Sequence, residues 1–263
     1  QANDFGADAP PGVRELDVLS RPTTIHDAYA FGVGFNLGLT FTPAPQWQIG
    51  LSYQHSVDLT FKGQVSIDMN HDLFTKDLAY DGLQYPAEVT GDAWIEMPLP
   101  SALRLGVGWS PAPWLDLHLM GAWVRHSIIE ELHITIDSDD LALPDLGVGS
   151  VSELSMPRRS QDAGEVELIA RVHVDEGTQL GLRVGYHSSS SPDQTIDLTS
   201  IDGHRIIGAL ISRFTLSERI ALTAQATLHQ LIPRDVVASD FDRGNGRYEM
   251  SIVGAGVALE GAW

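Results

Sequence analysis

Apolar and polar residues alternate at every second position through most of this chain, and no other feature constrains the fold as strongly. From Phe31 to Phe41 every odd-numbered residue is Phe, Val or Leu, and the residues between them are Gly, Asn or Thr. A period of two is the pattern of a β-strand with two unlike faces, whereas a helix repeats every 3.6 residues. Because helical periodicity is nearly absent, the sequence predicts an all-β protein.

The same alternation recurs along the chain and predicts nine strands. One of the longer strands contains Pro98 and Pro100, which predict a kink because proline cannot donate a ladder hydrogen bond. We expect the strands at about residues 28–42, 46–69, 88–110, 114–136, 164–174, 178–188, 204–214, 219–231 and 248–263.

The connections between the expected strands alternate in length. Short turns fall near residues 43–46, 111–113, 175–178 and 215–219, and two of them repeat a Pro-Ala-Pro sequence. Long polar links fall near residues 70–87, 137–163, 188–203 and 232–247. Short turns at one end and long loops at the other are typical of an outer-membrane barrel.

The two faces of these strands differ in a way that indicates the surroundings of the sheet. One face is apolar throughout, whereas the other carries Gly, Ser, Thr, Gln, His and charged residues and is too polar for a packed core. A soluble sandwich, the alternative class, would present a polar face to water. The longest clean apolar run, residues 252–259, is far shorter than the ~20 residues of a membrane-spanning helix. We therefore predict a transmembrane antiparallel up-and-down β-barrel with lipid outside and a polar lumen.

Tryptophan lies at or near the expected strand ends. Because its ring is apolar at one edge and polar at the other, this position favours an aromatic girdle at the membrane interface over ordinary core packing. The residues concerned are Trp47, Trp109, Trp114, Trp123 and Trp263.

Charge and cysteine content exclude several classes of function. The chain has 16 Lys and Arg against 35 Asp and Glu, a formal net charge of −19, so we expect no nucleic-acid partner, because phosphate recognition needs a basic face. The absence of cysteine excludes a disulfide framework, a thiolate metal site and a cysteine nucleophile.

Strand parity predicts that this sequence is the C-terminal part of a barrel. In such barrels the short turns are periplasmic and the long loops extracellular. The last expected strand follows a long loop and so ends in the periplasm, and the first of nine runs the same way. Residues 1–27 then form an extracellular loop or irregular segment before the barrel strands of residues 28–263. A complete barrel normally has an even number of strands, so an odd number is expected upstream.

Three stretches of this chain resemble the outer-membrane long-chain fatty-acid and aromatic-hydrocarbon transport family (FadL/TodX type, OmpP1). They run from Gly34 to Gly63, from Met97 to Ser127 and from Ser191 to Phe214, and their order and spacing carry the resemblance. It implies a barrel of fourteen strands with an N-terminal hatch and a kinked early strand that opens sideways. The nine expected strands correspond to the C-terminal nine, which leaves five upstream, an odd number.

Polar residues that alternate with the apolar face are the candidates for the lumen. An arginine facing lipid at mid-bilayer would cost ~2–4 kcal/mol, which supports this assignment. Either one lumen arginine binds a substrate carboxylate by a charge-assisted hydrogen bond, or the arginines pair with Asp116 and Glu167 to fill a polar interior. The candidates for ligand contact in the lumen are Arg104, His118, Arg171, Arg183, Arg213 and His229.

Histidines on alternate strands do not predict a metal site. His55, His126, His187 and His229 fall at similar heights, but strands two apart are separated by ~9–10 Å, too far for one ion with bonds of ~2 Å. We expect them to be interface or loop-anchoring residues. Asp137–Asp140 and the three residues Asp235, Asp240 and Asp242 are expected in solvated acidic loops; Ca²⁺ binding there is the alternative, without the spacing of an EF-hand.

Three of these four histidines begin a His-Ser pair: His55-Ser56, His126-Ser127 and His187-Ser188. Adjacent residues of a strand point to opposite faces, so these pairs cannot form a nucleophile and its base, and no catalytic residue is predicted. An Asp–His or Ser–His pair in hydrogen-bond reach on neighbouring strands would instead favour a barrel enzyme.

The function that the resemblance implies is passive uptake of hydrophobic molecules such as long-chain fatty acids across the bacterial outer membrane. The expected partners are fatty acids or hydrocarbons and outer-membrane lipid, and no cofactor is required for movement down a gradient. The alternative is a structural or adhesive barrel that binds partners through its extracellular loops; a well-packed lumen without an apolar pocket would favour it.

Overall fold

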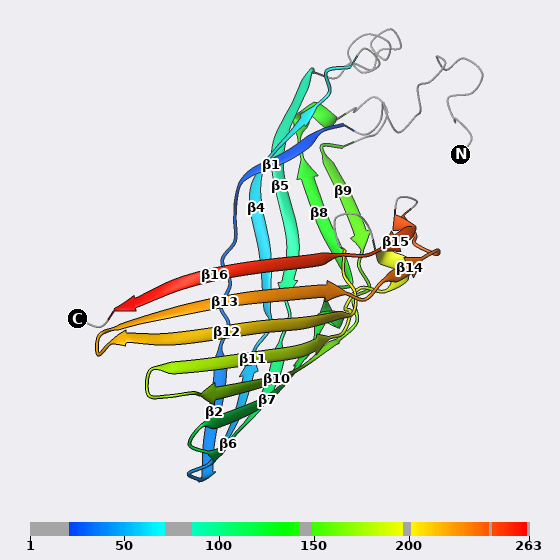
Figure 1. Cartoon of the computed structure of the whole chain (residues 1–263). Helices are drawn as coiled ribbons and strands as arrows, with labels where there is room; N and C mark the ends of the chain where they lie inside the picture. The colour runs from blue at the N-terminus through cyan, green and yellow to red at the C-terminus, as the bar shows by residue number, and fades with distance from the viewer. Residues whose placement is uncertain (1–20, 72–85, 143–148, 197–200, 242–243, 262–263) are drawn as a thin grey trace. The chain divides into compact units, whose positions relative to one another are not determined.

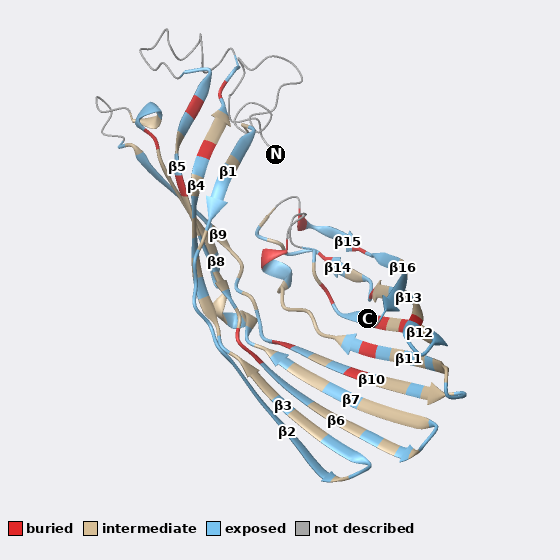
Figure 2. Ribbon diagram, turned by 90° about the vertical axis from the view of Figure 1, so that its left-hand side faces the viewer, coloured by how far each residue is buried: buried red, intermediate tan, exposed pale blue. Residues whose placement is uncertain are grey.

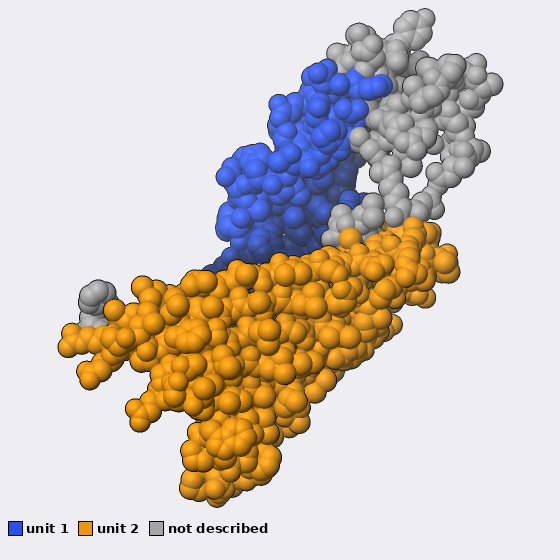
Figure 3. Space-filling model, in the orientation of Figure 1, with its two compact units in different colours: residues 1–32, 58–97, 132–156 blue, residues 33–57, 98–131, 157–263 orange. Residues whose placement is uncertain are grey.

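The computed structural model of this chain describes residues 21–71, 86–142, 149–196, 201–241 and 244–261. The described residues form antiparallel strands and a few single turns of 3₁₀ helix. They divide into two compact units (Figure 3): unit 1 contains residues 1–32, 58–97 and 132–156, and unit 2 contains residues 33–57, 98–131 and 157–263. No helix among the described residues is long and apolar enough to cross a membrane.

Unit 2 contains a nine-stranded sheet in which each strand pairs antiparallel with its neighbours (Figure 1). The spatial order is β16-β13-β12-β11-β10-β7-β6-β3-β2, which follows the order of the strands along the chain, so the predicted up-and-down antiparallel class is confirmed. The strands are β2 (Asn36–Ala44), β3 (Trp47–Gln54), β6 (Ala102–Ala112), β7 (Leu115–Val124), β10 (Ala163–His173), β11 (Thr178–His187), β12 (Arg205–Ser217), β13 (Ile220–Leu231) and β16 (Ser251–Gly261).

Short turns join these strands in pairs at one end of the sheet. Residues 45–46 connect β2 to β3, residues 113–114 connect β6 to β7, residues 174–177 connect β10 to β11, and residues 218–219 connect β12 to β13. Both Pro-Ala-Pro sequences lie at such turns. Proline has no N–H to donate, and at a strand end this costs the sheet few hydrogen bonds.

Unit 1 contains a five-stranded antiparallel sheet in the order β1-β4-β5-β8-β9. Val65, Val89 and Ala93 are fully buried in it. The strands are β1 (Thr23–Tyr29), β4 (Val57–Asp68), β5 (Glu88–Leu99), β8 (Glu131–Asp137) and β9 (Val151–Pro157).

The three longest expected strands are each divided in two, so their predicted continuity is wrong. The strand expected at 46–69 breaks between β3 and β4, where the amide of His55 donates to the carbonyl of Phe35 at 3.0 Å. The strand expected at 88–110 breaks at Pro100, and the one expected at 114–136 breaks at the 3₁₀ turn η3 (His126–Ile128).

Some expected loops contain regular structure. Part of the N-terminal segment expected to be irregular forms β1, and the link expected at 137–163 contains η4 (Asp139–Leu141) and β9. The link at 188–203 contains η6 (Asp193–Thr195), and the link at 232–247 contains the pair β14 (Arg234–Val236) and β15 (Gly246–Tyr248). Most of these elements are three residues long, too short for periodicity to identify.

One face of the nine-stranded sheet carries a dense set of large apolar residues that remain exposed. Figure 2 shows that most residues of these strands are exposed or of intermediate burial. Monomers in water rarely expose a contiguous apolar patch of this kind, so the face is built to meet an apolar surrounding. Its exposed members include Leu37, Leu39, Phe41, Leu51, Leu103, Leu105, Leu119, Val166, Leu168, Leu180, Leu182, Val184, Ile206, Leu210, Phe214, Leu228, Val253, Val257 and Leu259.

Trp47 and Trp109 stack with ring centroids 5.4 Å apart beside the short turns, and both remain about two-fifths exposed. Trp114 and Trp123 are somewhat more exposed than these two. These positions fit the predicted girdle; Trp263 lies outside the described residues.

Candidate functional site

Glycines leave a bare floor on the polar face of three neighbouring strands. Gly50 of β3 pairs with Gly106 of β6 on one side and with Thr40 of β2 on the other, and Gly38 lies one step along β2 on the same face. A Cβ atom built at Gly50 would meet nothing within 4 Å, and one at Gly106 would meet only Met120 Cγ at 3.8 Å. The space above this floor is therefore open.

The open space is a cavity of about 540 Å³, a size typical of small-molecule sites. Strands β2, β3, β6 and β7 form its floor, and β10 and β11 form a charged wall along one side. The lining residues are Gly38, Leu39, Thr40, Gly50, Leu51, Ser52, Arg104, Leu105, Gly106, Met120, Gly121, Ala122, Glu165, Glu167, Arg183 and His187.

The charged wall is centred on Glu167 of β10, whose side chain is only 9% exposed. Arg183 Nε donates to Glu167 Oε2 at 3.0 Å, a second guanidinium nitrogen of Arg183 donates to Oε1, and His187 Nε2 lies 3.0 Å from Oε1. Both carboxylate oxygens are thus occupied. His187 Nδ1 also lies 3.6 Å from Glu165 Oε1, so the histidine bridges two carboxylates.

The register of β10 against β11 explains this arrangement. Glu167 pairs with Gly185, and Arg183 and His187 stand two residues to either side of Gly185 on the same face. A Cβ at Gly185 would lie 2.9 Å from Glu167 Cγ, closer than real contacts allow. The absence of a side chain at Gly185 therefore leaves space for the Glu167 side chain to extend over β11 and contact both Arg183 and His187.

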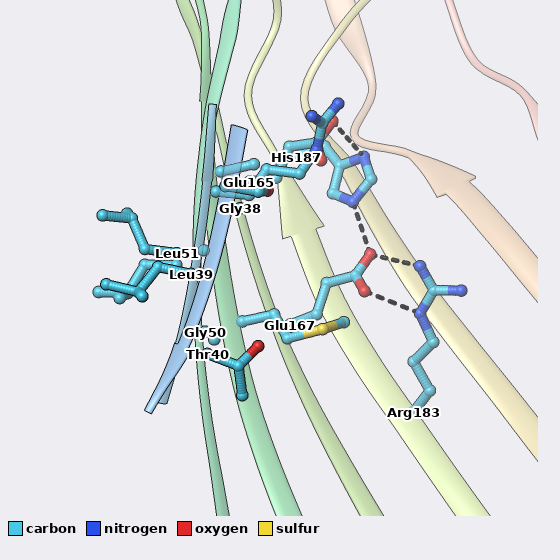
Figure 4. A pocket seen from close by; sticks show the side chains of 16 residues that line it. Gly38, Leu39, Thr40, Gly50, Leu51, Glu165, Glu167, Arg183 and His187 are labelled. Carbon is cyan, nitrogen blue, oxygen red and sulfur yellow. Dashed lines mark hydrogen bonds and ion pairs between the residues drawn. The ribbon is translucent and has the colours of Figure 1, made fainter. Parts of the chain in front are cut away.

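Figure 4 shows that the two faces of the sheet separate the two kinds of side chain. Glu165, Glu167, Arg183 and His187 gather on one side of the strands, joined by hydrogen bonds and ion pairs, whereas Leu39 and Leu51 point away on the other side. The apolar face and the cavity are thus opposite surfaces of one wall.

Three of the six predicted lumen residues lie at this cavity or beside it. Arg104 and Arg183 line it, and Arg104 Nη1 donates to Gln54 Oε1 at 3.3 Å. His118 lines an adjoining cavity of about 220 Å³ that shares Thr40, Gly50, Gly106 and Met120 with the larger one.

The other three predicted residues lie elsewhere on the sheet. Arg171 pairs in register with Asp116, Arg213 forms an ion pair of 3.1 Å with Glu260, and His229 lies between Ile207 and Ile252 on the neighbouring strands. Pairing with carboxylates, one of the two alternatives for these arginines, is thus found for Arg183 and Arg213. The sequence reasoning missed the glycine floor and the role of Gly185, although period-two counting places both on the polar face.

An Asp–His pair does join neighbouring strands, the feature that would favour an enzyme. His173 Nε2 of β10 lies 2.7 Å from Asp116 Oδ2 of β7, and Ser110 Oγ donates to Asp116 Oδ1 at 2.5 Å. Here the carboxylate stands between the serine and the histidine, whereas nucleophilic catalysis requires the histidine between the other two. Ser110 therefore has an acceptor but no activating base in this arrangement.

The histidines at similar heights are separated by different local structures. His126 lies in η3 and not on a strand, which corrects the expected position, and His55 stacks on Phe35 with centroids 4.7 Å apart.

Three residues of the expected acidic loops, Asp137, Asp139 and Asp140, line a polar cavity of unit 1, while Asp242 lies outside the described residues. Among the described residues no group of three or more potential ligands is arranged to hold a metal ion.

The loops that follow β11 and β13 form a cap with its own small core, made by Ile196, Leu231, Val236 and Tyr248. Asp202 accepts hydrogen bonds from the amides of Ser190 and Ser191 at 2.7 and 3.2 Å, and from the hydroxyl of Ser190 at 2.9 Å. Burial acts to raise the pKa of Asp202, but the hydrogen bonds from Ser190 and Gly203 and the charge of Arg205 outweigh it, so this pKa lies below its ordinary value.

Arg234 of β14 ties the same loops together. Its guanidinium donates to Asp193 Oδ1 at 2.7 Å, to the carbonyl of Ser191 at 2.8 Å and to the carbonyl of Asp202 at 3.1 Å. A planar fork with several donors can satisfy these three acceptors at once. The cap is therefore an ordered structure held by polar contacts as well as by its core.

The up-and-down antiparallel sheet with one apolar and one polar face is that of an outer-membrane β-barrel protein, and comparison with known families agrees. The family model described as outer membrane protein transport protein (OMPP1/FadL/TodX) matches residues 20–207. The chain belongs to this family, as the resemblance predicted, and its place is the outer membrane.

Solved structures share the fold at low sequence identity. A FadL homologue of Pseudomonas aeruginosa is 18% identical with a TM-score of 0.64, over 86% of this chain and 50% of that one. The monoaromatic hydrocarbon channel CymD is 12% identical with a TM-score of 0.58, over 89% and 52%. The toluene transporter TodX of Pseudomonas putida is 14% identical with a TM-score of 0.56, over 88% and 50%. The chain thus spans about half the length of these proteins. No curated protein matches it.

Proposed function

We propose that this protein contributes to a channel for passive uptake of hydrophobic molecules across the outer membrane. The observation that carries the proposal is the cavity over the glycine floor, which opens on the polar face of a wall whose other face is apolar. A barrel with a purely structural role would fill the space over these glycines with side chains, because protein interiors are normally packed with few voids. Membership of the transport family supports the same function.

The cavity suits a molecule with a large apolar surface. Its floor presents glycine backbone, Met120 and Ala122 with a few polar groups, among them Arg104, and the other charged groups lie along one wall. An apolar surface with a small number of placed polar groups is the usual design of a small-molecule site. The relatives differ in what their names say they carry, a monoaromatic hydrocarbon for CymD and toluene for TodX. We propose fatty acids or hydrocarbons as the class of substrate for this chain, with Arg104, His118 and Arg183 as the residues nearest to it.

Uptake into liposomes tests this function. The full-length protein is reconstituted, and entry of labelled oleate is compared with entry of a labelled sugar of similar mass, with empty liposomes as the baseline. We expect faster entry of oleate and no protein-dependent entry of the sugar. Equal protein-dependent passage of both would contradict the proposal, because it would indicate a general pore.

The ordered cap favours a second candidate, a structural or adhesive barrel that binds a partner through its loops. Loops that present a fixed surface need internal contacts, and Asp202 and Arg234 supply them. The open cavity disfavours this candidate, which predicts a well-packed lumen. Deletion of residues 236–241 distinguishes the two: loss of binding to cells or matrix with unchanged oleate entry would favour adhesion.

A further inference from the structure

The charged groups of the cavity wall balance one another. Arg104, Arg183, Glu165 and Glu167 line the same cavity, and the formal charges of these two arginines and two glutamates cancel. Arg183 does not project its charge toward the cavity freely, because Glu167 holds its guanidinium through two nitrogens. His187 is held in the same way between the two carboxylates.

We propose that Glu167 is a specificity-determining residue which, by holding Arg183, balances the charges of the cavity, so that of the two substrate classes proposed above uncharged apolar molecules bind more tightly than fatty-acid carboxylates. This inference rests on the proposed function, since it concerns what the same cavity accepts. Glu167 acts through Arg183 and is therefore a positioning residue.

Three observations carry the proposal. Glu167 is nearly buried, and a buried carboxylate is retained only where charged hydrogen bonds compensate its lost hydration. Its bond to Arg183 is bidentate, the geometry that binds a guanidinium most strongly. Gly185 leaves the space that this geometry requires, so the backbone is adapted to the network.

An entering carboxylate would meet an unfavourable arrangement at this wall. To pair with Arg183 it would have to displace Glu167, which would leave a nearly buried carboxylate without its partner. To approach His187 it would come close to both Glu165 and Glu167. A neutral molecule of the same shape meets neither cost and still covers the glycine floor.

The test compares a carboxylate with its neutral isostere. Equilibrium binding of dodecanoate and dodecanamide is measured at pH 8 with the full-length protein in nanodiscs, and empty nanodiscs give the background. The ratio of the two dissociation constants cancels effects on the fold or on apolar contacts. We expect the wild-type protein to bind dodecanamide more tightly.

Glu167→Gln is the decisive variant because it keeps the shape of the side chain and removes its charge. We expect the ratio to shift toward dodecanoate at least about tenfold, which corresponds to about 1.4 kcal/mol. Glu260→Gln is the matched control: it removes the carboxylate that pairs with Arg213 on the same sheet, outside the cavity lining, and should leave the ratio unchanged. The double variant Glu167→Gln/Arg183→Gln should restore the wild-type ratio, since the charges again cancel.

Each result decides a different point. Wild-type protein that binds dodecanoate at least as tightly as dodecanamide, or equal shifts in Glu167→Gln and Glu260→Gln, would overturn the role of Glu167 while the transport function stands. Binding of neither ligand above empty nanodiscs would overturn the proposed function itself, and this inference with it.

Discussion

Gly185 is the residue on which the Glu167 network depends sterically. Because a Cβ there would lie 2.9 Å from Glu167 Cγ, Gly185→Ala forces the carboxylate or the strand to move. We expect a loss of about 1–3 kcal/mol of unfolding free energy, the usual cost of an added methyl in a filled space. Urea unfolding of the protein in lipid vesicles, followed by tryptophan fluorescence, measures it.

Gly50→Ala is the control for that measurement. Gly50 lies on the same face of the same sheet, but its Cβ would meet nothing within 4 Å. We expect its unfolding midpoint to stay near that of the wild type. Equal losses in both variants would mean that strand glycine itself, and not the contact with Glu167, accounts for the effect.

Asp202 makes the cap sensitive to acid. Its pKa is lowered in the folded protein, so the stabilisation that it provides is fully present above the unfolded value of about 3.9 and is lost as the pH falls through the lowered folded value. We expect the amides of Ser190 and Ser191 to keep constant protection from pH 8 to pH 5 and to lose it below about pH 4. Hydrogen exchange corrected for intrinsic rates measures this protection.

Substitution of Asp202 should remove that pH dependence. We expect Asp202→Ala to expose both amides at every pH, with a local loss of about 1.5–3 kcal/mol, the range for hydrogen bonds to a charged group. Asp235→Ala is the control, because the Asp235 carboxylate is exposed and lies 3.5 Å from the equally exposed guanidinium of Arg247. A pH profile that is the same in wild type and Asp202→Ala would contradict the role of this carboxylate.

At the scale of elements, the side chain of Arg234 makes the polar contacts of β14 with the loop after β11, beside the small core that Val236 and Ile196 share. Arg234→Lys replaces a planar fork by a point charge that cannot satisfy Asp193 and two carbonyls together. We expect proteolysis of the cap to become about tenfold faster or more, because cleavage follows the population of the opened loop. Arg247→Lys, at an exposed ion pair, should change it little. Equal cleavage of the two variants would contradict this account.

The strands of the nine-stranded sheet were predictable because each has one continuous apolar face. Alternation such as that from Leu103 to Trp109 can be recognised in a single sequence, because every second residue of the strand meets the same surroundings. The Pro-Ala-Pro turns were predictable for an equally local reason, the missing N–H of proline.

The breaks between sheets were not predictable from alternation. Val57, Leu59 and Phe61 continue the pattern of β3 into β4, so nothing in the period indicates that the chain leaves one sheet and joins another. Strands β14 and β15 are three residues long each, and the partners of Arg234 that hold them are 32 to 45 residues away in sequence. Long-range hydrogen bonds of this kind leave no local signal.

The site was predictable in part for the same reason. Parity placed Glu167, Arg183 and His187 on the polar face, but it gives no register between strands. The contact of Glu167 with both residues depends on its position opposite Gly185, which only the pairing of β10 with β11 determines. The cavity arises from glycines that share a row on β3 and β6, again a matter of register.

For the whole molecule, the exposed apolar face predicts behaviour outside a membrane. Large side chains on nearly every strand of the sheet remain exposed, Leu210 by 64% and Val257 by 75%. We expect the purified protein to be monodisperse in detergent and to aggregate when the detergent is removed, because a patch of this extent associates in water. Size-exclusion chromatography measures this, and a monodisperse protein without detergent would contradict the lipid-facing assignment.

Spin-label accessibility along β13 tests the two-faced wall most directly. The chain has no cysteine, so single cysteines at positions 223 to 228 can each carry a nitroxide in the protein reconstituted in bilayers. We predict that labels at Ala224, Ala226 and Leu228 collide with oxygen, which concentrates in lipid, whereas labels at Thr223, Gln225 and Thr227 collide with a water-soluble nickel complex. A period of two, with the two quenchers out of phase, is the expected result. Access of the nickel complex to all six positions alike would contradict the account.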